Sequence, residues 1–225
     1  MFMTACSKKL SSKIQIFETS ANGNNLKEIK AGLKTKEPIV ISLLPEEKFQ
    51  TITGFGGSFT EASASLLNRL STENRKKILN AYFSEEGAKY SLTRTHIASC
   101  DFSLSNYTYA KVENDLQMAH FTIEDDKEDL IPMILEAQSI SKDGFNIIAS
   151  PWTCPPWMKD NKNYVGGKLL PEFNDAFSLY FSKYLEAYKK EGINIWGITV
   201  INEPHGNGNN WESTHFSPEE MTLFV

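Results

Sequence analysis

The sequence predicts an α/β protein in which parallel strands alternate with crossover helices. Strand-like runs such as "FNIIAS" and "INIWGITVI" alternate along the chain with segments whose apolar residues recur at helical spacing. These two runs are almost unbroken in apolar character, which indicates burial on both faces of a parallel sheet. An open doubly wound sheet and a closed (β/α)₈ barrel both satisfy this order of elements.

The first predicted elements are two strands joined by a turn. A β-branched apolar run covers 39–44, the chain turns at Pro45, and the strand pattern resumes over 49–57. Ser58 and Glu61 then have the spacing of a capping box, which predicts a helix directly after the glycines.

The remaining elements keep the alternation. Further helices are predicted over 72–83, within "DKEDLIPMILEAQSISKDG", and within "PEFNDAFSLYFSKYLEAYKKEG", and a last one begins at the capping box of "SPEE". The strand ends fall near Gly57, Ala98, Ser150 and Ile201, which are 41, 52 and 51 residues apart. Eight such units would need roughly 400 residues, within the barrel range, and this chain has about half of that length.

Polar and aromatic side chains stand where the predicted strands end. Asp101 and Phe102 follow the second strand, Trp152 follows the third, and Asn202 and Glu203 follow the fourth. In a parallel barrel these strand ends share one face, where functional side chains gather. Carboxylates and amides hydrogen-bond sugar hydroxyls, and a carboxylic acid can protonate a glycosidic oxygen, so the pattern points to sugar chemistry.

Composition excludes several other classes. The net charge of −5 comes without a long basic run, which argues against a nucleic-acid partner. No apolar run reaches the roughly 20 residues that span a bilayer. The three cysteines and four histidines lack metal-ligand spacing, and "GFGGSF" lacks the third glycine of a dinucleotide motif, so we expect neither metal nor cofactor.

Four motifs carry a resemblance to a known family. The motifs "GFGGSFTEA", "YSLTRTHIASCDFS", "SPWTCPPWMK" and "VINEP", in this order, resemble glycoside hydrolase family 30, in particular its glucosylceramidase-like branch. The resemblance covers roughly 49–225. It implies a (β/α)₈ barrel with an attached β-domain, and it implies two glutamates that cleave the glycosidic bond with retention. With this resemblance, 37–50 is expected to supply strands of the β-domain, and 51–225 the truncated first half of the barrel. Residues 7–36 are rich in Lys, Ser and Asn, so 1–36 is expected to be a lead-in or a lipoprotein tether.

The resemblance also implies site roles. Glu203 of the "NEP" triplet is similar to the acid/base, Asn202 to the residue that binds the sugar 2-hydroxyl, and Trp211 to an aromatic on the leaving-group side. The nucleophile would lie beyond Val225. The residues expected to bind substrate are Asp101, Phe102, Trp152, Asn202 and Trp211.

The implied substrate is a β-glucoside, which leaves several functions open. A glucosylceramidase or related β-glucosidase is the leading expectation. An endo-β-1,6-glucanase of the same family, or a noncatalytic sugar-binding remnant, is the alternative. The start "MFMTACSKK" resembles the end of a lipoprotein signal, so a lipid anchor at Cys6 and a periplasmic or cell-surface location are further expectations.

Overall fold

The computed structural model describes residues 15–30, 42–205 and 210–225, and the chain divides into two compact units, Met1–Gln50 and Thr51–Val225. In the smaller unit, β1 (Ile16–Glu18) pairs antiparallel with β2 (Lys27–Ile29). This hairpin lies within 1–36, for which the sequence predicted only a lead-in. Cys6, the expected anchor residue, lies outside the described residues.

The strands predicted over 37–50 are not found in the described part of that segment. Residues 42–50 contain no helix or strand, and 37–41 lie outside the described residues. Leu43, Leu44 and Phe49 are exposed, at 81%, 60% and 85%. Their apolar side chains are not covered, so the burial that would reward strand formation is missing here.

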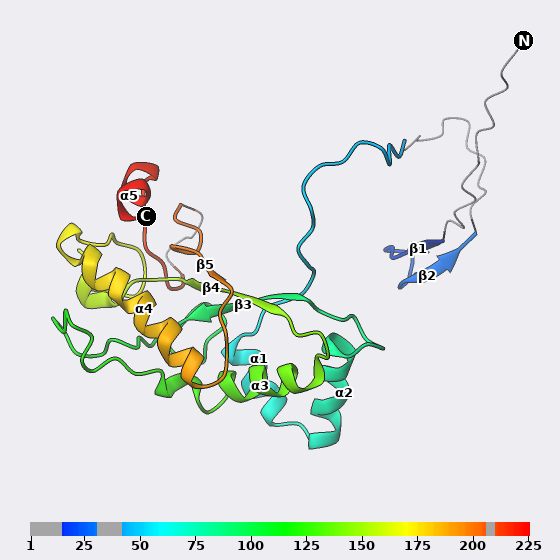
Figure 1. The fold of residues 1–225 in the computed structure, drawn as a ribbon, viewed down its shortest axis with the longest axis horizontal. Coiled ribbons are helices and arrows are strands. Elements are labelled where there is room, and N and C mark those ends of the chain that lie inside the picture. Colours follow the sequence, from blue (N-terminus) through cyan, green and yellow to red (C-terminus); the bar gives the residue numbers. More distant parts are fainter. Residues whose placement is uncertain (1–14, 31–41, 206–209) are drawn as a thin grey trace, which may run out of the picture. The chain divides into compact units, whose positions relative to one another are not determined.

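The larger unit is built on a parallel sheet (Figure 1). Its strands are β3 (Leu92–Ile97), β4 (Asn146–Pro151) and β5 (Gly197–Ile198), in the order β3-β4-β5. The strands predicted to end near Ala98 and Ser150 are confirmed as β3 and β4. The strand predicted within "INIWGITVI" was expected to be buried on both faces, but β5 has only two residues. Because β5 is the outer strand of the described sheet, Trp196 and Ile198 are 53% and 43% exposed.

An extended segment runs beside β3 where the first barrel strand was predicted. The amide of Phe59 donates to the carbonyl of Arg94 at 2.8 Å, and the amide of Arg94 donates to the carbonyl of Gly57 at 3.1 Å. A Cβ atom on Gly56 would lie 1.8 Å from the carbonyl oxygen of Leu92. Glycine is therefore required for this close approach, and the pairing is a single bridge between Ser58 and Arg94 rather than a full strand.

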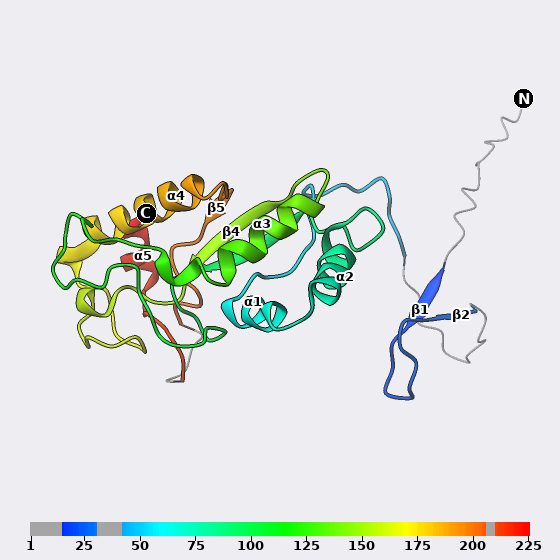
Figure 2. The same ribbon diagram turned by 90° about the horizontal axis from the view of Figure 1, so that it is seen from below.

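Four helices lie along one side of the sheet (Figures 1 and 2). They are α1 (Glu61–Asn68), α2 (Thr72–Phe83), α3 (Leu130–Ile140) and α4 (Asn174–Lys190). The predicted capping box of Ser58 and Glu61 is wrong, because Thr60 is the N-cap and its hydroxyl accepts from the amide of Ser63 at 3.2 Å. The carboxylate of Glu61 instead accepts from the amide of Leu104 at 3.0 Å.

A fifth helix, α5 (Pro218–Phe224), begins where the sequence predicted it. Ser217 and Glu220 form the predicted capping box. Phe224 packs against Phe177 of α4, with ring centroids 5.5 Å apart. Three 3₁₀ turns complete the described elements: η1 (Glu124–Asp126), η2 (Pro156–Met158) and η3 (Pro171–Phe173).

A buried carboxylate fixes the long loop that follows β3. Asp126 is 1% exposed and accepts hydrogen bonds from the hydroxyls of Tyr107 at 2.8 Å, Tyr109 at 2.5 Å and Tyr188 at 2.5 Å. Burial raises the pKa of this carboxyl above its ordinary value. Because Tyr188 belongs to α4, the cluster ties the loop to that helix and gives the segment 99–107 a defined position beside the strand ends.

Candidate active site

The carboxyl ends of the strands border a cavity of about 340 Å³. Phe102 and Trp152, two of the predicted substrate-binding residues, line it. The other lining residues come from the start of α1 and the segment before it, from β3 and from the loop after β3: Ser58, Phe59, Thr60, Ser63, Arg94, Thr95, His96 and Cys100. The cavity is therefore at the barrel face where the sequence predicted the site.

Arg94 connects three parts of this site. Its Nε donates to the Ser150 hydroxyl at 3.1 Å, its Nη2 donates to Oδ1 of Asn202 at 2.8 Å, and its guanidinium lies 4.7 Å from the ring centroid of Trp152. Oδ1 of Asn202 is thus occupied, which leaves the Nδ2 amide as the group that can donate to a ligand. One face of Trp152 is covered by the guanidinium, so a sugar would have to use its other face or its edge.

His96 shapes the backbone at the end of β3. Its Nε2 accepts a hydrogen bond from the amide of Glu61 at 3.1 Å, and its Nδ1 lies 2.6 Å from the carbonyl oxygen of Ala98. This arrangement requires the neutral ring with the proton on Nδ1. Ala98 has a φ of 58°, a left-handed conformation that costs energy for alanine. The turn redirects the chain so that Asp101 and Phe102 follow directly beside the strand end.

Asn202 and Glu203 differ sharply in environment. Asn202 is buried, and its amide continues the sheet by donating to the carbonyl of Pro151 at 2.8 Å. Glu203 is exposed and has a φ of 43°, another strained left-handed conformation. Within the described parts of the chain, its carboxylate has no hydrogen-bond or ion-pair partner.

Asp101 and Trp211 lie in a neighbouring cavity of about 310 Å³. Cys100 contributes to the walls of both cavities. The structure thus brings the predicted residues together as two adjacent groups, with Phe102 and Trp152 in one and Asp101 and Trp211 in the other. Glu203 lines neither cavity, and Asn202 joins the first group only through Arg94.

Lys159 joins the loops that follow β4 and β5. It is 1% exposed, and its ammonium donates to the Thr153 hydroxyl at 2.9 Å, to the carbonyl of Ser213 at 2.7 Å and to the carbonyl of Tyr164 at 3.3 Å. These three acceptors are neutral. Burial lowers the pKa of Lys159 to about 8. The contact with Ser213 sets the position of the segment that carries Trp211.

Because Lys159 is buried, we expect the protein to become more stable as the pH rises into the alkaline range. Between the folded pKa of about 8 and the ordinary value of 10.5, the unfolded state binds more protons than the folded state. The free energy of unfolding should therefore rise with pH, by up to about 2 kcal/mol between pH 8 and 10, relative to Lys159→Met. Denaturant unfolding of the full-length protein across this range checks it. Lys76→Met, at an exposed position, should follow wild type, and an unchanged slope in Lys159→Met would contradict the assignment.

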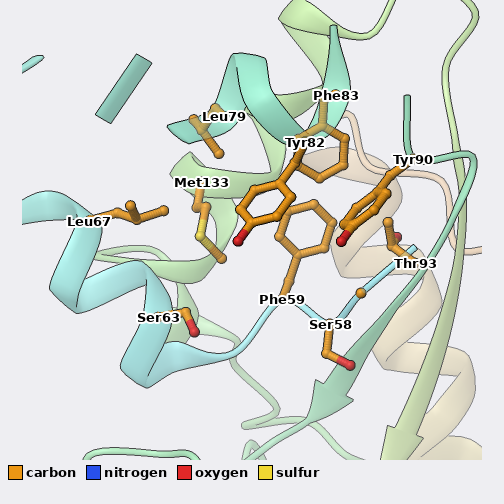
Figure 3. Close-up of a pocket in the computed structure, with 11 residues that line it drawn as sticks. Ser58, Phe59, Ser63, Leu67, Leu79, Tyr82, Phe83, Tyr90, Thr93 and Met133 are labelled. Carbon is orange, nitrogen blue, oxygen red and sulfur yellow. The ribbon is translucent and has the colours of Figure 1, made fainter. Parts of the chain in front are cut away.

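A third cavity, of about 250 Å³, lies on the helix side of the strands (Figure 3). The side chains around it come mainly from α1, α2 and α3, including Leu67, Leu79, Phe83 and Met133. Its lining is dominated by aromatic and aliphatic groups, and the strands separate it from the barrel face. We therefore regard it as a packing gap of the helix layer rather than part of the site.

Sequence patterns alone did not single out Arg94, His96, Lys159 or the buried Glu212. Arg94 and His96 do carry a signal, because residues two apart on a strand share a face. Polar residues on one face of an otherwise buried parallel strand indicate a functional interior.

Trp157 is a core residue, 8% exposed, whose indole donates to the carbonyl of Ala110 at 2.9 Å.

Within the described residues, no three His, Cys, Asp or Glu side chains are placed together to hold a metal ion. The helices of the same residues include none with the length and apolar character required to cross a membrane.

These features define the class of protein to which the chain belongs. Parallel strands covered by helices on one side, with an arginine, an amide and indole rings at their carboxyl ends, form a partial (β/α)₈ barrel with a site suited to carbohydrate. The profile of the glycosyl hydrolase family 30 TIM-barrel domain matches residues 52–225. The chain belongs to glycosyl hydrolase family 30.

Individual relatives agree with this assignment. Lysosomal acid glucosylceramidase of Mus musculus is 36% identical over 222 residues, which cover 93% of this chain and 43% of the mouse protein. The solved structure of SrfJ from Salmonella typhimurium superposes with a TM-score of 0.80 at 35% identity, covering 93% of this chain and 48% of SrfJ. An endo-β1,6-glucanase superposes with a TM-score of 0.78 at 31% identity, covering 94% of this chain and 47% of that enzyme. The chain thus spans about half the length of these proteins.

Proposed function

We propose that this chain forms the first half of the catalytic barrel of a retaining glycosidase that cleaves a β-glucosyl bond. The observation that carries the proposal is the hydrogen bond from Arg94 to Asn202, the residue directly before Glu203, whose carboxylate is exposed and has no hydrogen-bond or ion-pair partner among the described residues. It leaves the Asn202 amide free to donate to a sugar hydroxyl, next to a carboxyl group that is free to transfer a proton.

The proposed reaction has two steps. Glu203 protonates the departing glycosidic oxygen while a second carboxylate, supplied by another part of the barrel, attacks the anomeric carbon from about 5 to 5.5 Å away. Glu203 then takes a proton from the water that releases the sugar. Asn202 holds the 2-hydroxyl, a contact that strengthens in the transition state, and Asp101, Phe102 and Trp152 hold the rest of the sugar.

Two substrates are candidates for this site. Glucosylceramide is supported by the likeness to the mouse glucosylceramidase, and a β-1,6-glucan is supported by the superposition on the endo-β1,6-glucanase. Both share a β-linked glucose on the side that receives the nucleophile. They differ in the leaving group, which is a lipid in one and a sugar in the other.

The test uses the full-length protein that contains this chain. It is offered an aryl β-glucoside, glucosylceramide and a β-1,6-glucan, and released glucose or oligosaccharide is measured. We expect turnover of the aryl glucoside and of at least one natural glucoside, with retained β configuration in the first product by NMR. Turnover of none would reject the β-glucosidase assignment.

A further inference from the structure

The turn that contains Glu203 is strained, so it needs support on both sides. Glu203 has a φ of 43°, a left-handed conformation that a residue with a side chain keeps only when its surroundings impose it. On the N-terminal side, the amide of Asn202 donates to the carbonyl of Pro151 at 2.8 Å, and Oδ1 of Asn202 accepts from Arg94 at 2.8 Å. These contacts fix the chain only up to the residue before Glu203.

On the C-terminal side, the support comes from the imidazole of His215. Its Nδ1 lies 3.3 Å from the carbonyl oxygen of Pro204, the residue directly after Glu203. A carbonyl oxygen can only accept, so Nδ1 carries a hydrogen and donates it. In the described part of the chain, no other hydrogen bond reaches residues 203–205.

His215 can hold the turn because its own segment is fixed. The three residues before it, 212–214, are buried, with at most 4% exposed. The amide of His215 donates to the carbonyl of Gly167 at 2.8 Å. One residue earlier, the hydroxyl of Thr214 accepts from the amide of Cys154 at 3.0 Å. Both partners belong to the loop after β4, so a buried and hydrogen-bonded segment carries the imidazole.

The conformation of the turn and the position of the Glu203 side chain are coupled. A change of φ at Glu203 moves its own Cβ, and without the bond from His215 the strained φ would be free to relax. A general acid must lie within hydrogen-bond reach of the oxygen that it protonates, and a misplacement of about 1 Å can cost up to about 100-fold in rate. A contact that fixes this turn therefore acts on proton transfer.

We infer that His215 is a positioning residue, which holds the turn at Pro204 so that the carboxyl group of Glu203 stays within reach of the glycosidic oxygen. The inference rests on the proposed glycosidase function. His215 lines neither cavity at the strand ends, so its loss should act on the transfer of the proton rather than on the binding of the sugar.

Two glucosides with the same sugar separate proton transfer from loss of the fold. In the full-length protein, kcat/KM is measured for octyl β-glucoside, whose leaving group needs a proton, and for 2,4-dinitrophenyl β-glucoside, whose leaving group departs without one. His215→Leu removes the donor, and we expect it to lower the value for the octyl glucoside about 30-fold and that for the dinitrophenyl glucoside less than about threefold.

His215→Asn and a second histidine provide the controls. The amide Nδ2 of the asparagine takes the place of Nδ1, so this variant should bring the octyl value back to within about threefold of wild type. His120→Leu removes an exposed histidine that pairs with Asp115 at 3.2 Å, and it should change neither value. Equal losses on both glucosides in His215→Leu, or no recovery in His215→Asn, would mean that the histidine supports only the fold and would overturn the inference.

Backbone hydrogen exchange separates this inference from the proposed function. In the peptide that contains residues 202–205, exchange should be about tenfold faster in His215→Leu than in wild type, and close to wild type in His215→Asn. This result would support the hold on the turn even if the wild type turns over no glucoside, in which case only the glycosidase proposal fails. Unchanged exchange in His215→Leu would overturn the inference.

Discussion

Replacement of Glu203 by glutamine should lower kcat for an alkyl β-glucoside by about 10³-fold in the full-length protein. Glutamine keeps the size of the side chain but cannot give a proton to a poor leaving group. An aryl glucoside departs without that proton, so its first step should be much less affected. Its second step still lacks the base that activates water. Steady-state and burst kinetics on both substrates measure the two effects separately.

Azide provides the sharper check of this role. It attacks the glycosyl-enzyme without a base, so it should restore turnover of the aryl glucoside in Glu203→Gln and yield the β-glucosyl azide. Glu219→Gln, at an exposed position in the first turn of α5, should leave kcat within about twofold of wild type. A Glu203→Gln enzyme that keeps full activity on the alkyl glucoside would remove Glu203 from the proposed mechanism.

The parallel architecture could be predicted because burial leaves a clear pattern in sequence. The runs at β3 and β4 are bounded by turn residues, and their observed ends, Ile97 and Pro151, lie within one residue of the predicted ones. The edges of the sheet were less predictable. Residues 49–57 and 193–201 have strand-like composition. Regular strand pairing, however, depends on having an adjacent strand on each side, and composition does not show which adjacent strands are present.

The site could be predicted as a set of residues but not as a geometry. Asp101, Trp152 and Glu203 were identified because they follow strand ends. Their division between two cavities depends on the turn at Ala98 and on the loop that Asp126 holds, and both are tertiary effects. Arg94 was missed for a similar reason, since its three contacts join residues 56 to 108 positions away in sequence.

The second large effect is expected at Arg94. In Arg94→Met the apolar chain keeps most of the volume beside Trp152, but Oδ1 of Asn202 loses its donor. The Ser150 hydroxyl still accepts from the hydroxyl of Thr199 at 2.8 Å. A buried amide without its partner is free to rotate, so Asn202 would no longer present Nδ2 to the sugar. We expect kcat/KM for an aryl β-glucoside to fall about 100-fold, which corresponds to the loss of one buried charge-assisted hydrogen bond and of the contact it orients.

We propose that Arg94 is a positioning residue, and a 2-deoxyglucoside tests that role directly. This substrate lacks the hydroxyl that Asn202 is proposed to bind, so Arg94→Met should cost it less than about fivefold while it costs the parent glucoside about 100-fold. Arg75→Met removes an arginine that pairs with Glu136 on the helix layer, at 2.9 Å, and should leave the ratio between the two substrates unchanged. Equal losses on both substrates in Arg94→Met would mean that the arginine supports only the fold, and the role of Asn202 at the 2-hydroxyl would lose its structural basis.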